Sequence, residues 1–548
     1  MSNLYTGYEK SPQRAVLKAL GLTDAEINKP MVGVIVSASK NSPECNMLDS
    51  FADVIGESVK AAGGVSVKLY CHSHSELLTP GLNTGRFMLA LRESVADSVE
   101  VAVNVNSLDA AVLVGNDDIT LAGMVMGACR ANIPVAAFCS GGARGAGVGG
   151  GDNIFSLLDV MGGISVGKSN NTELERLTEA ALNAVGNSGM YFNNGLGFAL
   201  EALGLSVIGS AETDILSGEK TAIAKKYGKL IMTAITNNFT IKNMINAENV
   251  KNAIAADAAL GGSGSALLHL LAIAYQLGVN FKKELNVEII NGIYKKTPVL
   301  VNFYPSGKTT FADFKASGGM SAVIKELIKN NIMNGESATV AGRFNTQLND
   351  IGGGHIESFG APYSKSALIS IIEPNFAEYG VLRRNLDSVL TNKQYKAKVF
   401  NNEEDAVFAI ENGVVTEGTA LVIRYEGPKA GMKDLTLAAA KLNGRDIAEN
   451  VLLITDGRLS TYYKGISVTQ ISGEALAGGF IASLADGDII ELDINKGKLE
   501  AKVNSKEMNN RLKRTKMPER DLGGIYLKRF AENVNSAELG ASYSKGER

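Results

Sequence analysis

Up to about residue 300, short runs of apolar and β-branched residues alternate with segments whose apolar residues recur at helical spacing. This alternation is typical of βαβ units around a mostly parallel sheet. The predicted strands span 31–39, 65–71, 110–115 and 133–139, and the predicted helices span 46–64, 86–105 and 121–132. We therefore expect an amino-terminal α/β domain.

From about residue 365 the pattern changes to short apolar runs separated by Gly, Asp and Asn turns, which favours a β-rich domain such as a barrel or a sandwich. Its expected strands span 366–372, 396–400, 419–425, 450–455, 488–494 and 498–503. Because residues 350–365 are rich in Gly and polar types, we predict an α/β domain over 1–360 and a β-barrel-like domain over 361–548. The tail over 539–548 is expected to be loose.

Charge and cysteine content narrow the class of protein. The chain has 548 residues with 54 Lys and Arg against 57 Asp and Glu, a net charge of −3. Nucleic acid and anionic membrane surfaces are therefore not expected partners. No apolar run is long enough to cross a bilayer and the amino end is polar, which predicts a cytoplasmic protein. Four irregularly spaced cysteines suit a reducing compartment.

Two glycine-rich patterns resemble phosphate-binding loops. Residues 162–169, GGISVGKS, have P-loop spacing, but the segment before them is helix-like rather than a strand. The next helix is expected to begin at Thr172, with a capping box to Glu175. In residues 141–151, GGARGAGVGGG, almost any glycine pattern arises by chance. We interpret this second stretch as a loop that is mobile or covers a substrate.

Three polar groups are candidates for chemistry. On an extended strand, His72, His74 and Glu76 would share one face and suit a divalent cation, or they are a polar strand end with surface histidines. Asn116, Asp117 and Asp118 follow an apolar strand, where ligands bind in open α/β sheets, or they cap the next helix. Glu426, Arg458 and Ser460 also follow strands, although turn chemistry alone would explain them.

Ten segments in chain order resemble the dihydroxy-acid and phosphogluconate dehydratase family. They are SPECN, RESVADSVE, GNDDITLAGMVMGA, ALGGSGSALLHLLAIA, PSG, FADFKASGG, VIRYEGPKAGM, LITDGRLS, EALAGGFIASLADGDII and SAELGA. The resemblance implies an α/β domain followed by a β-barrel domain, assembled as a homodimer or homotetramer. It also implies removal of water from a 2,3-dihydroxy carboxylate, in which a magnesium ion holds the substrate, a Ser alkoxide takes the C2 proton and an iron–sulfur cluster binds the leaving hydroxyl.

The resemblance implies that the metal-binding part of the family's active site is retained in this sequence. The family's early acidic ligand falls at Glu76, while Asp117 and Glu426 match its other ligands directly. Asp118 stands where the family has a carbamylated Lys, and its carboxylate also offers anionic oxygen to a hard ion. Ser460 matches the proton-abstracting Ser. The implied cofactor is Mg²⁺ or Mn²⁺.

The cluster half does not carry over. Of three family cysteines only Cys45 remains, because the others fall at Asn116 and Asn187. Asn amides are poor substitutes for thiolates, so we predict no iron–sulfur cluster. Cys71 and Cys139 could rebuild a cluster site, which is one alternative.

The substrate face has changed as well. Ser263 and Ser265 stand within the family's Gly-Gly-Ser-Thr-Asn segment, and Thr461 and Tyr462 replace the Gly-Gly after Ser460. The candidate substrate-binding residues are Ser263, Ser265, Lys429 and Arg458.

These changes lead to three hypotheses about function. The first is a divalent-metal-dependent lyase or isomerase of a hydroxy acid or sugar acid, acting by C2 proton abstraction, with His72 or His74 as an alternative acid for dehydration. The second is a non-catalytic paralogue that binds a small acid or a partner enzyme. The third is a cluster-containing dehydratase with rearranged ligands.

Overall fold

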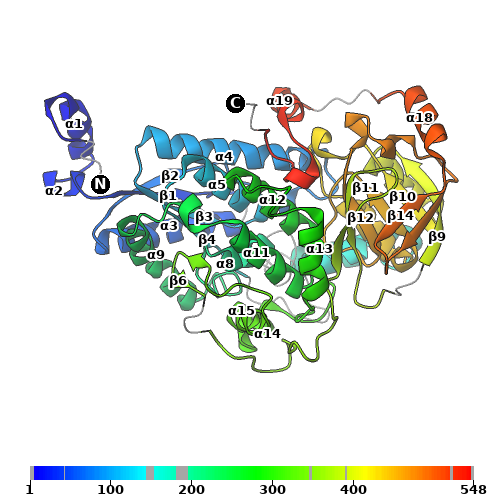
Figure 1. Ribbon diagram of the computed structural model, residues 1–548, viewed down its shortest axis with the longest axis horizontal. Coiled ribbons are helices and arrows are strands. Elements are labelled where there is room, and N and C mark those ends of the chain that lie inside the picture. Colours follow the sequence, from blue (N-terminus) through cyan, green and yellow to red (C-terminus); the bar gives the residue numbers. More distant parts are fainter. Residues whose placement is uncertain are drawn as a thin grey trace.

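A computed structural model of the chain describes residues 5–41, 43–142, 153–180, 195–344, 348–388, 392–518 and 523–544. Its amino-terminal half is built on a four-stranded sheet in the order β2-β1-β3-β4 (Figure 1). The strands are β1 (Met31–Val36), β2 (Val65–Tyr70), β3 (Ala110–Gly115) and β4 (Val135–Cys139). Every pair is parallel, which confirms the predicted α/β domain.

Helices cover this sheet at the predicted places. They are α3 (Pro43–Ala61), α4 (Met88–Val105) and α5 (Asp118–Ala131). A further helix over the sheet, α9 (Gly218–Thr236), was not among those predicted. Two glycines of α5 allow it to approach α4 closely. A Cβ atom on Gly123 would lie 2.5 Å from the Arg92 carbonyl oxygen, and one on Gly127 would lie 2.3 Å from that of Ala96. Larger residues at these positions would push the two helices apart.

The strand and helix alternation ends earlier than predicted. In the described residues after β4, the chain up to residue 300 continues only in helices, and those from residue 195 onward pack as a layer beside the sheet. Besides α9, the helices of residues 195–329 are α8 (Gly195–Leu203), α10 (Ile241–Met244), α11 (Ala247–Ala259), α12 (Gly264–Leu277), α13 (Val287–Lys296), α14 (Phe311–Ala316) and α15 (Gly319–Lys329). Two short helices, α1 (Ser11–Ala19) and α2 (Asp24–Ile27), project from the amino end, and β5 (Ala338–Thr339) pairs with β6 (Gly342–Arg343).

The carboxyl-terminal half contains a nearly closed, barrel-like sheet of eight strands in the order β14-β13-β9-β10-β11-β12-β8-β7. The four central strands are parallel and the outer pairings are antiparallel. The strands are β7 (Ile369–Ile372), β8 (Tyr379–Arg383), β9 (Asn392–Phe400), β10 (Thr419–Ile423), β11 (Leu452–Thr455), β12 (Ile466–Ser472), β13 (Ile489–Asp493) and β14 (Lys498–Ala501). The barrel-like prediction is confirmed, although β8 and β12 were not among the predicted strands.

One helix from early in the chain belongs to the core of this second half. Helix α6 (Ile154–Gly163) packs on α17 (Thr436–Gly444), where a Cβ atom on Gly162 would lie 2.0 Å from the Ala440 carbonyl oxygen. Phe155 lies in the same apolar cluster as strands β10 and β11 and helix α16 (Glu403–Glu411). The helical interpretation of the segment before GGISVGKS is thus confirmed.

The start of the next helix differs from the prediction. Helix α7 (Asn171–Ala180) begins one residue before Thr172, and the Glu173 amide donates to Asn170 Oδ1. Asn170 therefore caps this helix, so the capping box predicted at Thr172 was wrong. Lys168 forms an ion pair with Asp446 of the second half.

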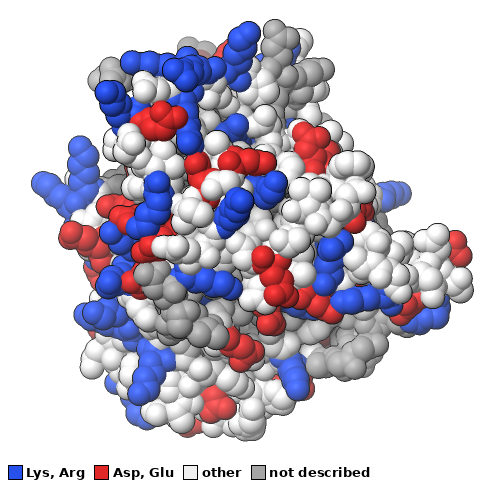
Figure 2. All heavy atoms as spheres, turned by 90° about the vertical axis from the view of Figure 1, so that its right-hand side faces the viewer, with Lys and Arg blue, Asp and Glu red and all other residues white. Residues whose placement is uncertain are grey.

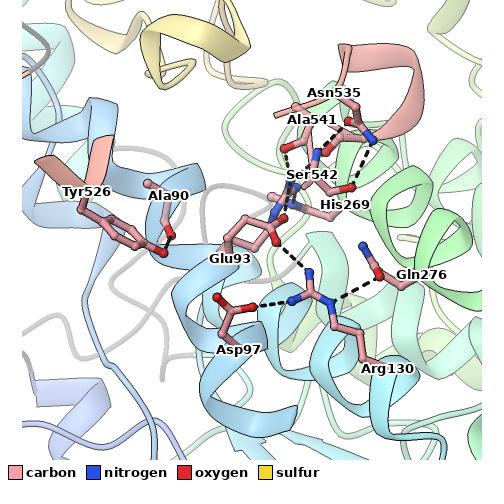
Figure 3. A network of polar contacts seen from close by, with 12 residues as sticks. Ala90, Glu93, Asp97, Arg130, His269, Gln276, Tyr526, Asn535, Ala541 and Ser542 are labelled. Carbon is pink, nitrogen blue, oxygen red and sulfur yellow. Dashed lines mark hydrogen bonds and ion pairs between the residues drawn. The ribbon is translucent and has the colours of Figure 1, made fainter. Parts of the chain in front are cut away.

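As far as residue 544, the carboxyl-terminal segment is bound to the first half of the chain and is not loose. After α18 (Ser505–Arg514), helix α19 (Ile525–Asn533) lies near α4, and the Tyr526 hydroxyl donates to the Ala90 carbonyl oxygen at 3.0 Å (Figure 3). The buried Arg92 Nη2 donates to the carbonyl oxygens of Gly540 and Ala541 at 2.7 and 2.5 Å. These contacts overturn the expected loose tail for residues 539–544, because a buried guanidinium retains its hydrogen-bond partners.

The face of the barrel half carries both signs of charge. Lys and Arg side chains are interspersed with Asp and Glu side chains there (Figure 2), in keeping with the net charge of −3. Of the helices whose residues the structure describes, none is long and apolar enough to span a bilayer.

Candidate active site

Two acidic residues lie where β3 ends and α5 begins. Asp117 caps α5, because its Oδ1 accepts from the Thr120 amide and its Oδ2 from the Thr120 hydroxyl, both at 2.9 Å. Asp118 Oδ1 accepts from the Leu196 amide at 3.0 Å. Burial raises the pKa of Asp117 to about 6 and raises that of Asp118 well above its usual value, and the neighbouring carboxylate adds to the second shift. Asp117 therefore caps the helix, and Asp117 and Asp118 together also concentrate negative charge at this strand end.

The segment before Glu76 is not the extended strand that we predicted. Strand β2 ends at Tyr70, residues 71–75 are irregular, and Glu76 begins a short 3₁₀ helix. Glu76 is buried while His72 is exposed and His74 is half-buried, so the three side chains do not share one face. Burial lowers the pKa of His74, and its Nε2 has no hydrogen-bond partner. The predicted strand ends early because the Cys71 amide makes the last ladder bond, to Val36.

Arg458 connects Glu76 to the second half of the molecule. Its Nη1 lies 3.6 Å from Glu76 Oε1, and its Nε donates to the Met432 carbonyl oxygen at 2.8 Å. Burial raises the pKa of Glu76 well above its usual value; Asp117, Asp118 and Asp434 raise it further, and Arg458 opposes them. The guanidinium thus faces a group of buried carboxylates from both halves of the chain.

Ser460 adjoins the same group. It is 9% exposed, its hydroxyl accepts from the Tyr462 amide at 3.4 Å, and its backbone amide is hydrogen-bonded to Asp434. Burial raises the pKa of Asp434, and Arg458 lowers it. Sequence reasoning missed Asp434, which only its contact with Arg458 reveals.

Glu426 is fully buried and is bound by an arginine from the first half. Arg86 Nη1 lies 2.8 Å from Glu426 Oε2, and Arg86 Nη2 donates to Glu426 Oε1 at 3.0 Å. The Glu426 amide donates to Asp456 Oδ1 at 2.8 Å, which fixes the turn after β10. Arg86 was not among the predicted site residues, because 340 residues separate it from Glu426.

Of the remaining predicted substrate residues, Ser263 and Lys429 make structural contacts of their own. Ser263 caps α12 through its hydroxyl, and its amide donates to Asp257 Oδ2 at 3.0 Å. Ser265 is half-buried in the first turn of α12. The Lys429 amide donates to Glu474 at 3.0 Å. Asp257 raises the pKa of Asp118, so this serine loop adjoins the carboxylate group.

The two cluster positions that the structure describes hold a buried thiol and a buried amide. Cys45 is buried, with its thiol 3.8 Å from the His74 carbonyl oxygen, and Asn116 accepts a hydrogen bond from the Ser140 hydroxyl. Burial raises the pKa of Cys71 to about 12 and that of Cys139 to about 11. Asn187 and residues 143–151 of the glycine-rich loop lie outside the described residues.

The family resemblance implies two cofactors, a divalent cation and an iron–sulfur cluster, which need different ligand atoms. Glu76, Asp117 and Asp118 are buried oxygen donors; Asp117 and Asp118 raise the pKa of Glu76, and Asp117 raises that of Asp118. This concentration of negative charge fits a hard divalent cation. Their oxygens are not gathered in advance, since no three Asp, Glu, His or Cys side chains in the described ranges are arranged to hold a metal ion. The four cysteines are all buried and form no disulfide bond, and in the described residues they are not part of such a group either.

Comparison with known proteins identifies the family. The model of the dihydroxy-acid/6-phosphogluconate dehydratase N-terminal domain matches residues 29–348, and that of the C-terminal domain matches residues 354–541. The chain belongs to this family. It is 35% identical to a dihydroxy-acid dehydratase of Clostridium botulinum over 549 residues, with 98% of each chain covered. It is 34% identical to the one of Caldanaerobacter subterraneus over 555 residues, again with 98% of each covered.

Membership confirms the predicted enzyme class. The family consists of dehydratases, so the chain is a hydro-lyase, and its relatives match it along nearly the whole length. The framework of the dehydratases is therefore retained, while Asn116 and Asp118 differ from the residues that the family resemblance implies at the site.

Replacing Asp257 by Asn is expected to remove a pH-dependent loss of stability. Burial raises the pKa of Asp257 from 3.8 to about 7, so the folded chain binds this proton more tightly than the unfolded chain, and stability falls as pH rises between those values. An Asn oxygen can still accept from the Ser263 amide, and its NH₂ takes the place of the unpartnered Oδ1.

We expect Asp257→Asn to unfold at the same denaturant concentration as the wild type near pH 4 and to be more stable by a few kcal/mol at pH 8. Denaturant unfolding at both pH values measures this difference. A variant that is less stable at pH 8 would contradict it.

Proposed function

We propose that the protein removes the C2 proton of a hydroxy acid or sugar acid with the Ser460 hydroxyl, and that it then eliminates water from this acid or isomerises it, without an iron–sulfur cluster. The position of Ser460 carries this proposal. Its amide is hydrogen-bonded to Asp434, beside an arginine that also faces Glu76. A hydroxyl next to buried cationic charge can lose its proton more easily, which is what a general base requires.

The elimination has three parts, which are removal of the C2 proton, loss of the hydroxyl from C3 and tautomerisation. Ser460, as the alkoxide, takes the proton from C2, the C3–O bond breaks, and the departing hydroxide takes a proton to become water. The enol that remains tautomerises to a 2-keto acid. Burial lowers the pKa of His74, which disfavours its protonated form as the acid that donates to the leaving group.

Glu76, Asp117 and Asp118 would hold the divalent cation, and Glu426 would join them if Arg86 released it. Mg²⁺ or Mn²⁺ bound there supplies Lewis-acid stabilisation of the negative charge that develops on the substrate. Arg458 orients Glu76 and keeps water away from its carboxylate by packing against it. Buried thiols with raised pKa values and the amide at Asn116 support a site without iron and sulfide.

The proposal is tested by incubating the purified protein in D₂O with Mg²⁺ or Mn²⁺ and a panel of 2-hydroxy acids and sugar acids. NMR is expected to show loss of the C2 proton signal for at least one acid, and EDTA is expected to stop the exchange. Absence of exchange with every acid would overturn the proposal. It would favour the alternative in which the chain only binds a small acid.

Replacing Asp117 by Asn is expected to weaken Mn²⁺ binding at least tenfold, because one anionic oxygen is lost from the proposed cation site. Asp109→Asn is the matched control, since Asp109 lies at the opposite end of β3 and accepts from the Met31 amide. Isothermal titration with Mn²⁺ measures both variants. Equal affinities for the wild type and Asp117→Asn would show that Asp117 only caps α5.

A further inference from the structure

The amino-terminal arm, residues 5–28, carries an apolar stripe that its own chain leaves exposed. Tyr8, Val16 and Leu20 of this stripe are 83%, 62% and 76% exposed. Residues four apart lie on the same face of a helix, so Val16 and Leu20 lie side by side at the end of α1. The arm projects from the molecule at the end where α9 also lies (Figure 1).

The rest of the chain does little to stabilise this arm. Arg14 donates to two backbone carbonyl oxygens of the arm itself, and Lys18 pairs with Asp24 of the arm at 2.8 Å. Leu17 packs half-buried against the core of the first half, but no residue of α1 is fully buried. A helix as short as α1 is marginally stable in water on its own. The exposed stripe therefore indicates that another surface covers α1.

Helices α3 and α9 form a groove on the surface of the first half that suits such a stripe. The volume of this α3–α9 groove is about 710 Å³, and its lining includes the small or apolar residues Val54, Ser58, Ala61 and Ala62. The two helices lie close together at Gly228, where a Cβ atom would be 2.1 Å from the Ser58 carbonyl oxygen. The Gly228 amide also donates to the Ser58 hydroxyl at 3.0 Å, so the groove is preformed. Its small side chains leave room for larger apolar ones.

The charges along the α3–α9 groove complement the arm. Lys225 and Lys229 of α9 line one side, are exposed, and form no ion pair within the described part of the chain. On the other side, Asp53 and Glu57 of α3 already pair with lysines of their own chain. The arm carries the exposed Glu9 at the beginning of the stripe. An arm that enters the groove with Glu9 toward the two lysines therefore brings opposite charges together.

A second copy of the same chain is the occupant that these features fit. In Figure 1 the arm extends away from α9, so the groove of its own chain stays open. Each of two copies can therefore offer one arm and receive another, and such reciprocal contacts close into a twofold-symmetric pair. We propose that the arm of one chain docks in the α3–α9 groove of a second copy, and that the exchanged arms hold the two chains together. This inference is independent of the chemistry proposed at Ser460.

Engineered disulfide bonds test the contact directly in the full-length protein. The four natural cysteines are buried, so they do not compete with cysteines placed on the surface. Val16→Cys/Ala61→Cys is expected to form covalent dimers after mild oxidation, as seen on a non-reducing denaturing gel. Val16→Cys alone and Ala61→Cys alone are expected to remain monomers on the same gel.

Val16→Cys/Val105→Cys is the matched control, because Val105 is 77% exposed at the end of α4 and does not line the groove. It is expected to remain monomeric on the gel. Monomers from Val16→Cys/Ala61→Cys would overturn the proposal. Equal cross-linking of this variant and of the control or either single variant would overturn it as well.

Sedimentation velocity shows whether the arms hold the chains together. Val16→Asp/Leu20→Asp places charges in the stripe and is expected to raise the dissociation constant of the pair by about a hundredfold or more. Both side chains are exposed, so the circular dichroism spectrum should not change. Phe408→Asp is the control, because Phe408 is 69% exposed on α16 of the second half, and it is expected to sediment like the wild type. A monomeric wild type, or an arm variant that assembles like the wild type, would contradict the exchange of arms.

Discussion

Replacing Ser460 by Ala is expected to lower the rate of C2 proton exchange by about 10²–10⁴-fold, the usual contribution of a positioned general base. The substitution removes one hydroxyl from a residue that is 9% exposed and leaves the backbone amide that binds Asp434 in place. The fold and the binding of the acid should therefore change little. The measurement is the exchange rate in D₂O at saturating acid, together with the dissociation constant of the same acid.

Ser483→Ala provides the matched control for this variant. Ser483 is also a buried serine of the second half, and its hydroxyl donates to the Phe480 carbonyl oxygen at 2.7 Å. We expect Ser483→Ala to exchange the C2 proton at the wild-type rate. Exchange by Ser460→Ala within threefold of the wild type would exclude Ser460 as the base, whatever the affinity for the acid.

Replacing Arg92 by Met is expected to destabilise the protein by about 3–5 kcal/mol, the usual cost of removing one partner from a buried charged contact. Arg92 donates to the carbonyl oxygens of Gly540 and Ala541 and lies 3.0 Å from His269 Nδ1. Met cannot donate, so these acceptors lose their partner in a buried site. The carboxyl-terminal segment should then detach from helices α4 and α12 first.

Limited proteolysis and thermal melting detect this detachment. Arg92→Met is expected to melt several degrees lower than the wild type and to be cut first within residues 523–544. Arg529→Met is the control, because Arg529 is exposed on α19 and only stacks on Tyr526, with 4.9 Å from its guanidinium carbon to the ring centroid. A wild-type cleavage pattern in Arg92→Met would mean that apolar packing alone holds the segment.

The sequence indicated most of the framework because its strands are continuous apolar runs. Strand β3 spans the predicted residues 110–115, all of them buried. Strand β12 escaped prediction because it carries Ser467, Thr469 and Gln470, polar residues that are buried only where the two halves meet. The local pattern cannot show which polar positions another part of the chain will cover.

Long-range pairing explains what the sequence could not predict at the site. Asp117 and Asp118 could be located because a strand end precedes them, and Ser460 because the family motif contains it. Arg86 has no local signal, because its role depends on Glu426, which lies 340 residues away in the sequence. The domain boundary near residue 360 stays a prediction.

Iron and acid-labile sulfide in the anaerobically purified protein test the central claim, a hydro-lyase that works without an iron–sulfur cluster. We predict colourless protein with far less than one iron and one sulfide per chain, which still exchanges the C2 proton when Mg²⁺ or Mn²⁺ is added. Brown protein with stoichiometric iron and sulfide, whose exchange activity disappears when the cluster is removed, would contradict the claim.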